Sequence, residues 1–323
     1  MTSLDATASA PVTIVGAGLA GLACARALGD SGIHAHVVDR GKRVGGRVAA
    51  RTLAGRQVDI GASYLTAREG SGFAGVVDDW VTRGLAREWT RTFHVAEGRG
   101  LNGESTGPVR YAAPGGLRSL VVDLAQGVDV RPATTVESVE PGRVDSALAA
   151  EVVLAMPDPQ ARRLIEDAAP LGAALEKEAG WEPVIAVVLG WSTRAWDADL
   201  HGVFVNADPK ISFIADDGDR RGDDAPVLVV HTTAGFARRH LAHPDGAIPD
   251  VVHAVRQTLG IRIDPAWTFA HRWSFARPAA GRHQPYARAG GRAVCGDAWG
   301  SEPAARTAWE SGHALGLAIA ADR

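Results

Sequence analysis

The sequence predicts an α/β fold organised in two domains. Its 323 residues suffice for about two domains on the usual length scale. Residues 12–39 follow a strand, glycine turn, helix and strand pattern, whereas residues 180–275 consist mostly of short strand patterns with one helix near 247–259. The 46% hydrophobic and 22% charged composition is that of an ordinary globular chain able to bury a large core.

The N-terminal segment has the pattern of a βαβ dinucleotide-binding unit. "PVTIVGAG" is typical of a buried strand, a helix follows and ends near Gly32, and "IHAHVVD" is a second strand that ends at Asp39. In such a turn Gly16 permits the tight bend, Gly18 lets a phosphate approach the backbone, and Gly21 brings the helix close to the strand. The positive helix end then faces a pyrophosphate, and Asp39 can accept ribose hydroxyl protons. The alternative is a strand–helix turn that binds nothing.

The remaining elements complete the α/β reading. A helix is expected over 115–126, strands over 128–132 and 134–141, and a strand running through a turn at Pro157 into a helix over 150–165. Near the C-terminus a strand breaks at Gly296, and a last helix covers about 303–320. The charged run "DDGDRRGDD" at 216–224 is expected to be a solvated hairpin tip.

Composition excludes several classes of protein. The net charge of −3 argues against a global attraction to nucleic acid or to an anionic membrane. Cys24 and Cys295 lie in apolar stretches, so neither a disulfide nor a metal site is expected. The uncharged run 10–25 is short and glycine-rich for a membrane span, and the first ten residues lack the basic start of a secretory signal. A cytoplasmic location is therefore expected.

The stretch "RGKRVGGRVAARTLAGRQVDIGASYLT" (40–66) adds a second glycine loop, Gly45–Arg47, followed by Asp59, Gly61, Ala62 and Tyr64. An arginine there can bind two phosphate oxygens with its planar fork, which suits a resident rather than a visiting cofactor. The alternative is an ordinary surface turn. With these motifs the chain resembles the FAD-dependent amine-oxidase-like flavoproteins.

The C-terminal stretch "VCGDAWGSEPAARTAWESGHALG" (294–316) carries the second half of the resemblance. In that family a Gly-Asp pair, here Gly296 and Asp297, lies beside the ribityl chain, and a helix start faces the flavin pyrimidine. The family's Glu-Gly is replaced here by Arg306 and Thr307. The resemblance implies non-covalent FAD bound by the following residues: Gly16, Gly18, Leu19, Ala20, Gly21, Asp39, Arg40, Gly45, Gly46, Arg47, Gly61, Ala62, Ser63, Tyr64, Val136, Gly296, Asp297, Ala304, Ala305 and Ala308.

Both ends of the chain would thus hold one FAD. The implied architecture is amine-oxidase-like, with a discontinuous Rossmann-like FAD-binding domain and a substrate domain built on a mixed sheet. The expected FAD-binding domain comprises 1–70, 108–168 and 286–323, and the substrate domain comprises 71–107 and 169–285.

Four further stretches, at 59–73, 111–125, 152–161 and 271–278, resemble the renalase-like branch of this superfamily. That resemblance implies hydride transfer from a wrongly reduced isomer of NAD(P)H to flavin N5, with dioxygen as electron acceptor and hydrogen peroxide as product. Ser63, Leu65, Gly116 and Phe213 stand where relatives usually carry glutamine, phenylalanine, methionine and tryptophan. The substrate can therefore differ from that of the branch.

Three residues are candidates for the catalytic site. Tyr64 and Trp273 are expected to form flat walls around the reacting ring, and His271 lies on the same strand face as Trp273. Each has an alternative role in the core, because tryptophan is heavily buried on average and a histidine can fill a polar gap. Trp299 and Trp309 are interpreted as packing residues.

Lysines bear on the alternatives. The chain has three, Lys42, Lys177 and Lys210, whereas amine oxidases of the wider superfamily often place a lysine near N5. Lys210 is expected to be exposed, which weakens an amine-oxidase or desaturase reading. A flavin-binding protein without turnover is the third possibility. The expected partners are a small-molecule substrate and dioxygen, and the oligomeric state is not predicted.

Overall fold

The computed structural model describes residues 10–165, 171–175, 177 and 180–323. The chain forms two compact units. Unit 1 comprises Met1–Arg47, Val121–Trp181 and Arg277–Arg323, and unit 2 comprises Val48–Leu120 and Glu182–Ala276. Residues 48–70 and 108–120 are predicted to belong to the FAD-binding domain, but their contacts place them in unit 2. The allocation of these segments to a function stays a prediction.

Unit 1 is built on a six-stranded sheet in the order β17-β18-β11-β1-β2-β7. β1 pairs in parallel with β2 and with β11, which gives the crossover topology expected of a βαβ unit. All four residues of β1 are buried, as expected for a central parallel strand. The strand bounds are β1 Val12–Val15, β2 Ala35–Val38, β7 Asp129–Arg131, β11 Glu151–Leu154, β17 Ala287–Ala289 and β18 Arg292–Val294.

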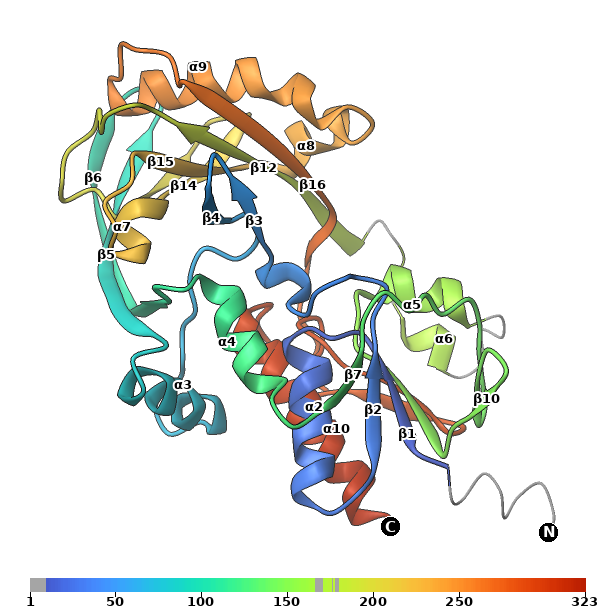
Figure 1. Cartoon of the computed structure of the whole chain (residues 1–323). Coiled ribbons are helices and arrows are strands. Elements are labelled where there is room, and N and C mark those ends of the chain that lie inside the picture. The colour runs from blue at the N-terminus through green and yellow to red at the C-terminus, as the bar shows by residue number, and fades with distance from the viewer. Residues whose placement is uncertain (1–9, 166–170, 176, 178–179) are drawn as a thin grey trace, which may run out of the picture. The chain divides into compact units, whose positions relative to one another are not determined.

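Helices from the two ends of the chain pack tightly against each other. α2 (Leu19–Asp30) and α10 (Ala305–Ala321) lie side by side, blue and red in Figure 1. A Cβ added to Gly312 would meet the Ala20 carbonyl oxygen at 1.9 Å, and one added to Gly316 would meet the Ala27 Cβ at 2.7 Å. Glycine is therefore required for this close crossing, which brings the two ends of the chain together in unit 1.

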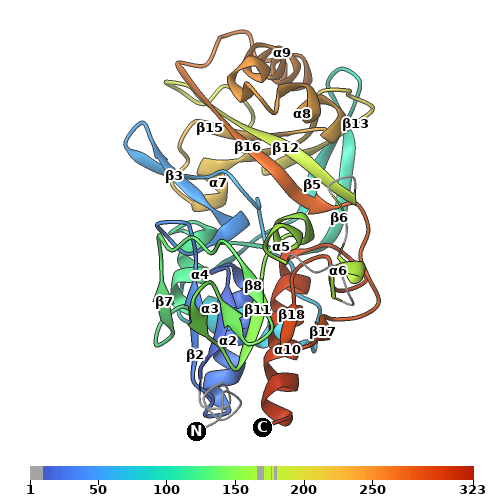
Figure 2. The same ribbon diagram turned by 90° about the vertical axis from the view of Figure 1, so that its right-hand side faces the viewer.

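Smaller elements complete unit 1. A three-stranded sheet has the order β10-β9-β8 and lies between β7 and β11 in sequence (Figure 2). The bounds are β8 Val139–Glu140, β9 Arg143–Val144, β10 Ala147–Leu148, α5 Asp158–Leu164 and α6 Leu171–Ala174.

Unit 2 contains a seven-stranded sheet in the order β16-β12-β15-β14-β13-β5-β6. β13 pairs antiparallel with β14 but parallel with β5, so the sheet is mixed, as predicted. The strand bounds are β5 Arg87–Glu97, β6 Leu101–Ala112, β12 Trp181–Gly190, β13 Gly202–Asn206, β14 Ile211–Asp216, β15 Val227–Thr232 and β16 Trp267–Pro278. The long hairpin β5–β6 is an element for which no specific prediction had been made.

The two faces of this sheet bury different layers. Val187 and Leu189 of β12 pack in the core that includes α8 and α9, whereas Val188 between them packs with Val58 and Ile60. Figure 1 shows α8 and α9 on one face and the hairpin β3–β4 with α7 on the other. The bounds are β3 Ala50–Leu53, β4 Arg56–Asp59, α3 Gly72–Thr82, α4 Leu117–Leu124, α7 Asp217–Arg221, α8 Ala234–His240 and α9 Ile248–Leu259.

The expectation of a solvated hairpin tip at 216–224 is wrong for residues 216–221, whereas residues 222–224 are exposed. The first part contains the short helix α7, and Asp216, Asp217 and Arg220 are at most 1% exposed. These charges are buried because acids and arginines lie three and four residues apart and pair with one another and with groups of other elements.

Candidate functional site

The glycine turn of unit 1 has the geometry that the sequence predicts. Gly16 has a φ of +118°, and a Cβ added to it would lie 2.4 Å from the Ala155 carbonyl oxygen. A Cβ on Gly21 would lie 1.9 Å from the Gly16 carbonyl oxygen. On Gly18 it would meet no protein atom within 4 Å, so protein packing does not explain a glycine there. Close approach of a ligand to Gly18 stays a prediction. Leu19 and Ala20 then begin α2 and are buried.

Asp39 organises the same turn. Its two carboxylate oxygens accept backbone N–H groups, from Ala17 at 2.7 Å and from Gly41 at 2.6 Å. Each oxygen keeps a further lone pair, so the carboxylate can also accept ribose hydroxyls. The adjacent Arg40 is exposed. The Asp39 carbonyl accepts the N–H of Thr134 at 2.9 Å, in the extended segment that carries half-buried Val136.

The second glycine loop packs directly on the first. Gly45 donates its N–H to the Ala17 carbonyl at 2.9 Å. Gly45 and Gly46 have φ values of +130° and +53°, which other residues adopt only with strain. A Cβ on Gly46 would lie 3.4 Å from the Cα of Gly18. The two loops therefore form one continuous backbone surface.

Arg47 connects this loop to the C-terminal segment. Its guanidinium donates two parallel hydrogen bonds to Asp297, at 2.7 and 2.6 Å, and its centre lies 5.4 Å from the Trp181 ring. A bidentate pair of this kind fixes both partners, and three of the five guanidinium donors point elsewhere. The structure thus gives Arg47 a second role in addition to the predicted phosphate clasp, which stays a prediction.

The C-terminal half-site is a glycine bend followed by a helix start. Gly296 has a φ of +155°, and its N–H binds the Ser311 hydroxyl at 2.9 Å. Half-buried Ala304 precedes α10 without a side-chain cap, so the first N–H groups at Ala305 and beyond lack a capping side chain. Such a helix end attracts negative charge. Arg306 and Thr307 both bind Glu302, and Ala308 is buried.

In unit 2 the predicted site segment Asp59–Tyr64 leaves the end of β4. The Asp59 carboxylate is 1% exposed and accepts the Leu117 N–H at 3.1 Å, while Arg221 Nη2 lies 3.1 Å from its other oxygen. Burial raises the pKa of Asp59, and the neighbouring arginines act in the opposite direction. Gly61, Ala62 and Ser63 continue the segment, of which only Ala62 is half-exposed before Tyr64.

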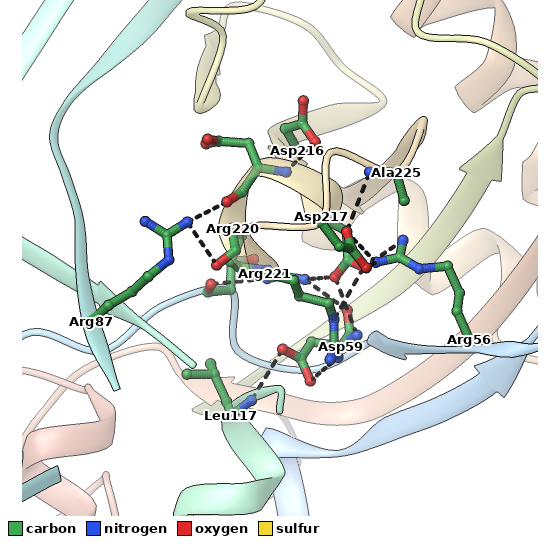
Figure 3. Close-up of polar contacts among 12 residues, drawn as sticks. Arg56, Asp59, Arg87, Leu117, Asp216, Asp217, Arg220, Arg221 and Ala225 are labelled. Carbon is green, nitrogen blue, oxygen red and sulfur yellow. Dashed lines mark hydrogen bonds and ion pairs between the residues drawn. The ribbon is translucent and has the colours of Figure 1, made fainter. Parts of the chain in front are cut away.

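The helix α7 holds this segment through a buried ionic cluster (Figure 3). Arg220 binds the Asp217 carboxylate and donates to the carbonyl oxygens of Ser63 at 2.9 Å and Asp59 at 3.4 Å. Arg56 binds the opposite oxygen of Asp217 at 3.0 Å. Sequence reasoning missed these residues. One sequence feature could have indicated them: acids and arginines alternate in the run 216–224 at spacings that allow ion pairs, and a simple loop rarely carries so many charges of both signs.

Trp273 and His271 project from β16 on one face. The Trp273 indole N–H donates to the Ile60 carbonyl at 2.7 Å, so this half-buried ring also holds the Asp59–Tyr64 segment. The His271 ring lies 4.6 Å from the Trp273 ring. Burial, with help from Arg51 and Arg272, lowers the pKa of His271 to about 4, which leaves the imidazole neutral at pH 7.

Tyr64 lies in a separate group of rings, the Tyr64 cluster. Its members are Tyr64, Trp89, Phe93, Phe204 and Phe213, with Tyr64 centred 5.4 Å from Phe93 and 6.1 Å from Phe213. The Arg110 guanidinium lies 4.1 Å from the centre of Phe93 and 5.6 Å from that of Tyr64. Tyr64 and Trp273 thus belong to different clusters, and the segment 59–64 joins them.

Lys210 belongs to unit 2, whereas the other two lysines belong to unit 1. Lys210 Nζ binds Asp250 of α9 at 2.6 Å, on the helix-covered side of the sheet. Lys42 and Lys177 are exposed on unit 1. Within the described residues, no group of three His, Cys, Asp or Glu side chains is arranged to hold a metal ion. Trp299 and Trp309 are buried, as their interpretation as packing residues requires.

Comparison with known families decides the class of protein. A model of NAD(P)-binding Rossmann-like domains matches residues 14–80, and a model of flavin-containing amine oxidoreductases matches residues 68–313. The chain belongs to the flavin-containing amine oxidoreductase family. The chain is an FAD-dependent oxidoreductase, and the predicted cofactor and enzyme class are confirmed.

Individual relatives of this amine oxidoreductase are distant. Polyamine oxidase 1 of Oryza sativa subsp. japonica is 33% identical over 147 residues, which make up 43% of this chain and 25% of that protein. A solved candidate protoporphyrinogen oxidase from Exiguobacterium sp. 255-15 superimposes with a TM-score of 0.79 at 15% identity, covering 98% of this chain and 99% of the other. Cyclohexylamine oxidase from Brevibacterium oxydans IH-35A gives 0.75 at 14% identity, covering 97% and 99%. These structures show the shared fold.

The described part of this amine oxidoreductase contains no helix both long and apolar enough to span a bilayer.

Proposed function

We propose that this amine oxidoreductase oxidises an isomeric dihydronicotinamide dinucleotide and returns it to the oxidised coenzyme, as in the renalase-like branch. FAD, when bound, accepts a hydride at N5 and passes the two electrons to dioxygen, which yields hydrogen peroxide. The residues present fit this cofactor without a covalent bond. The glycine at position 18 is not required by protein packing, and Cys295 is completely buried, which raises the pKa of its thiol to about 12.

The FAD would be held by the two glycine loops, by Asp39 and by the C-terminal half-site at Gly296, Asp297 and the start of α10. Their backbone N–H groups suit the pyrophosphate and the electron-rich part of the flavin. Arg47 would keep the second loop and Asp297 in register through their bidentate pair. The predicted cofactor contacts of residues 61–64 stay a prediction.

The observation that carries the substrate proposal is the chemistry around segment 59–64. Near one end of the segment, the Trp273 indole N–H donates to the Ile60 carbonyl, and at the other end Tyr64 packs in the Tyr64 cluster. The neighbouring His271 is neutral at pH 7. Oxidation of a dihydropyridine needs flat walls and a dry site and no proton acceptor. Lys210, the lysine of unit 2, is paired with Asp250 on the helix-covered side of the sheet, which disfavours the lysine-assisted oxidation of amines.

Oxidation of an amine is the second candidate, and the family membership favours it. Polyamine oxidase and cyclohexylamine oxidase are among the relatives, and both are named for amine substrates. A flavin-binding protein without turnover is the third.

One experiment separates the three. The FAD-loaded enzyme is mixed without oxygen with dihydronicotinamide isomers of NAD(P)H, with ordinary NADH as control, and with a polyamine or cyclohexylamine. Rapid bleaching of the flavin absorbance by the isomers alone supports the first proposal. Bleaching by the amines alone replaces it with the second, and no bleaching by any compound leaves the third.

A further inference from the structure

A buried arginine without a carboxylate partner lies within the Tyr64 cluster. Arg110 of β6 is 5% exposed, and its guanidinium lies 4.1 Å from the centre of Phe93 and 5.6 Å from the centres of Tyr64 and Phe204. Its one hydrogen bond in the described part of the chain goes from Nη1 to the Arg91 carbonyl at 2.5 Å. No described carboxylate forms an ion pair with it.

This arrangement is unusual, because a buried guanidinium is nearly always neutralised. Arg220 and Arg221 of the same unit follow the rule, since each binds a buried aspartate. The rings and the single carbonyl around Arg110 offset only part of the lost hydration of its charge. The single carbonyl leaves other donors of the guanidinium without an acceptor in the described part of the chain. None of them is among the fully buried polar atoms that lack a partner, so an added ligand can reach them.

The acid that binds a ring of the cluster, Asp219, is already engaged. Asp219 accepts the Trp89 indole N–H at 2.5 Å and lies 2.6 Å from His201 Nδ1, which raises the pKa of His201. This carboxylate is thus neutralised by its own partners and does not face Arg110 as a counter-ion.

The reachable part of the cluster is next to Arg110. Trp89, Phe93 and Phe213 are at most 8% exposed, whereas Tyr64 and Phe204 are half-buried. These two accessible rings are both within 5.6 Å of the guanidinium. A flat ligand on Tyr64 would therefore bring a substituent towards a positive charge.

We propose that Arg110 binds an anionic group, a phosphate or a carboxylate, of a ligand whose ring lies against Tyr64. The inference deepens the proposed function and rests on it for the identity of the ring. It assigns the substrate to the anionic class, because a protonated amine in the same place would be repelled by Arg110. For a dihydronicotinamide nucleotide the anion is a phosphate.

The first test uses three probes that share one ring and differ in charge. Binding of benzoate, benzamide and benzylamine to the FAD-loaded enzyme is measured by titration calorimetry. Benzoate is expected to bind at least about tenfold more tightly than benzamide, with benzylamine weakest. Arg110→Met should abolish the preference, Arg110→Lys should keep part of it, and Arg91→Met, which removes an exposed charge from the neighbouring strand, should keep all of it.

FAD content and the thermal midpoint of each variant are measured in parallel, so that a preference lost through unfolding is recognised. If Arg110→Met unfolds, the preference for benzoate over benzamide in wild type, and its partial loss in Arg110→Lys, still test the inference. The inference is overturned if wild type does not prefer benzoate, or if a folded Arg110→Met variant still prefers benzoate.

The second test distinguishes the sources of the anion and separates this inference from the proposed function. Flavin reduction is compared for an isomeric dihydronicotinamide riboside, which is uncharged, and for its mononucleotide, which carries phosphate. Wild type should favour the mononucleotide about tenfold or more in kcat/KM, and Arg110→Met should treat the two alike. Equal reaction in wild type overturns the phosphate contact but leaves the proposed function intact. The isomeric dinucleotide serves as the reference substrate. No reaction with any of the three compounds refutes the proposed function, and the benzoate series still tests Arg110.

Discussion

Replacing Arg220 by methionine should destabilise unit 2 far more than replacing Arg56 by methionine. Both arginines bind the fully buried Asp217, but only Arg220 also donates to the backbone carbonyls of Asp59 and Ser63. Arg220 is 1% exposed, so its removal leaves Asp217 short of one cation and two buried carbonyls without a donor. Arg56, whose side chain is 18% exposed, also binds the surface residue Asp223.

The magnitudes follow from burial. Breaking one partner of a buried ion pair typically costs about 3–5 kcal/mol, and we expect that range for Arg220→Met. For Arg56→Met we expect about 1 kcal/mol, because water reaches this arginine and Arg220 and Arg221 still neutralise Asp217. Since Arg220 holds the carbonyls of the segment before Tyr64, flavin reduction should also slow in Arg220→Met and remain normal in Arg56→Met.

The assay is urea unfolding of the FAD-loaded enzyme, followed by tryptophan fluorescence, with the rate of flavin reduction measured on the same samples. Arg220→Lys, which keeps a charge but not the fork, should lie between wild type and Arg220→Met. The reasoning is refuted if Arg220→Met costs less than about 1 kcal/mol, or if Arg56→Met costs as much.

Three further predictions concern the other site residues. Arg47→Ala should lower the ratio of FAD to protein after purification. Adding Asp297→Ala to this variant should lower the ratio little further, because the two residues form one bidentate pair. Trp273→Phe, which loses the indole N–H bound to Ile60, should slow flavin reduction with FAD retained; unchanged kinetics would assign Trp273 to packing. The pKa of His271 is lowered to about 4 in the folded protein, so protonation of the unfolded chain should reduce stability as pH falls from about 6.5 towards 4. Urea unfolding at several pH values should show a shallower fall for His271→Gln.

Local pattern was sufficient to predict the βαβ unit and the last helix. The strands and helix of residues 12–38 follow the expected order because hydrophobic periodicity and glycine spacing are properties of neighbouring residues. The mixed sheet of unit 2 was likewise visible as a succession of short strands. Local sequence pattern does not show which distant residue a charged side chain pairs with.

Long-range pairing explains what was missed. The run at 216–224 contains both signs of charge, and contacts with Asp59, Ser63 and Arg56 decide that its part 216–221 is buried. Arg110 is similarly unremarkable in sequence, because its ring neighbours come from three other parts of unit 2. The pairing of Arg47 with Asp297 spans 250 residues, and its existence depends on the packing of α2 against α10.

That span has a consequence for biogenesis. At about 5–20 residues per second, a ribosome needs roughly 12–50 s to extend a nascent chain from Arg47 to Asp297. Throughout this interval α2 lacks the glycine-lined surface of α10 that covers it. With FAD held by both ends of the chain, as proposed, its capture would be a late event in translation, and a prematurely terminated polypeptide would expose apolar surface without gaining the nucleotide.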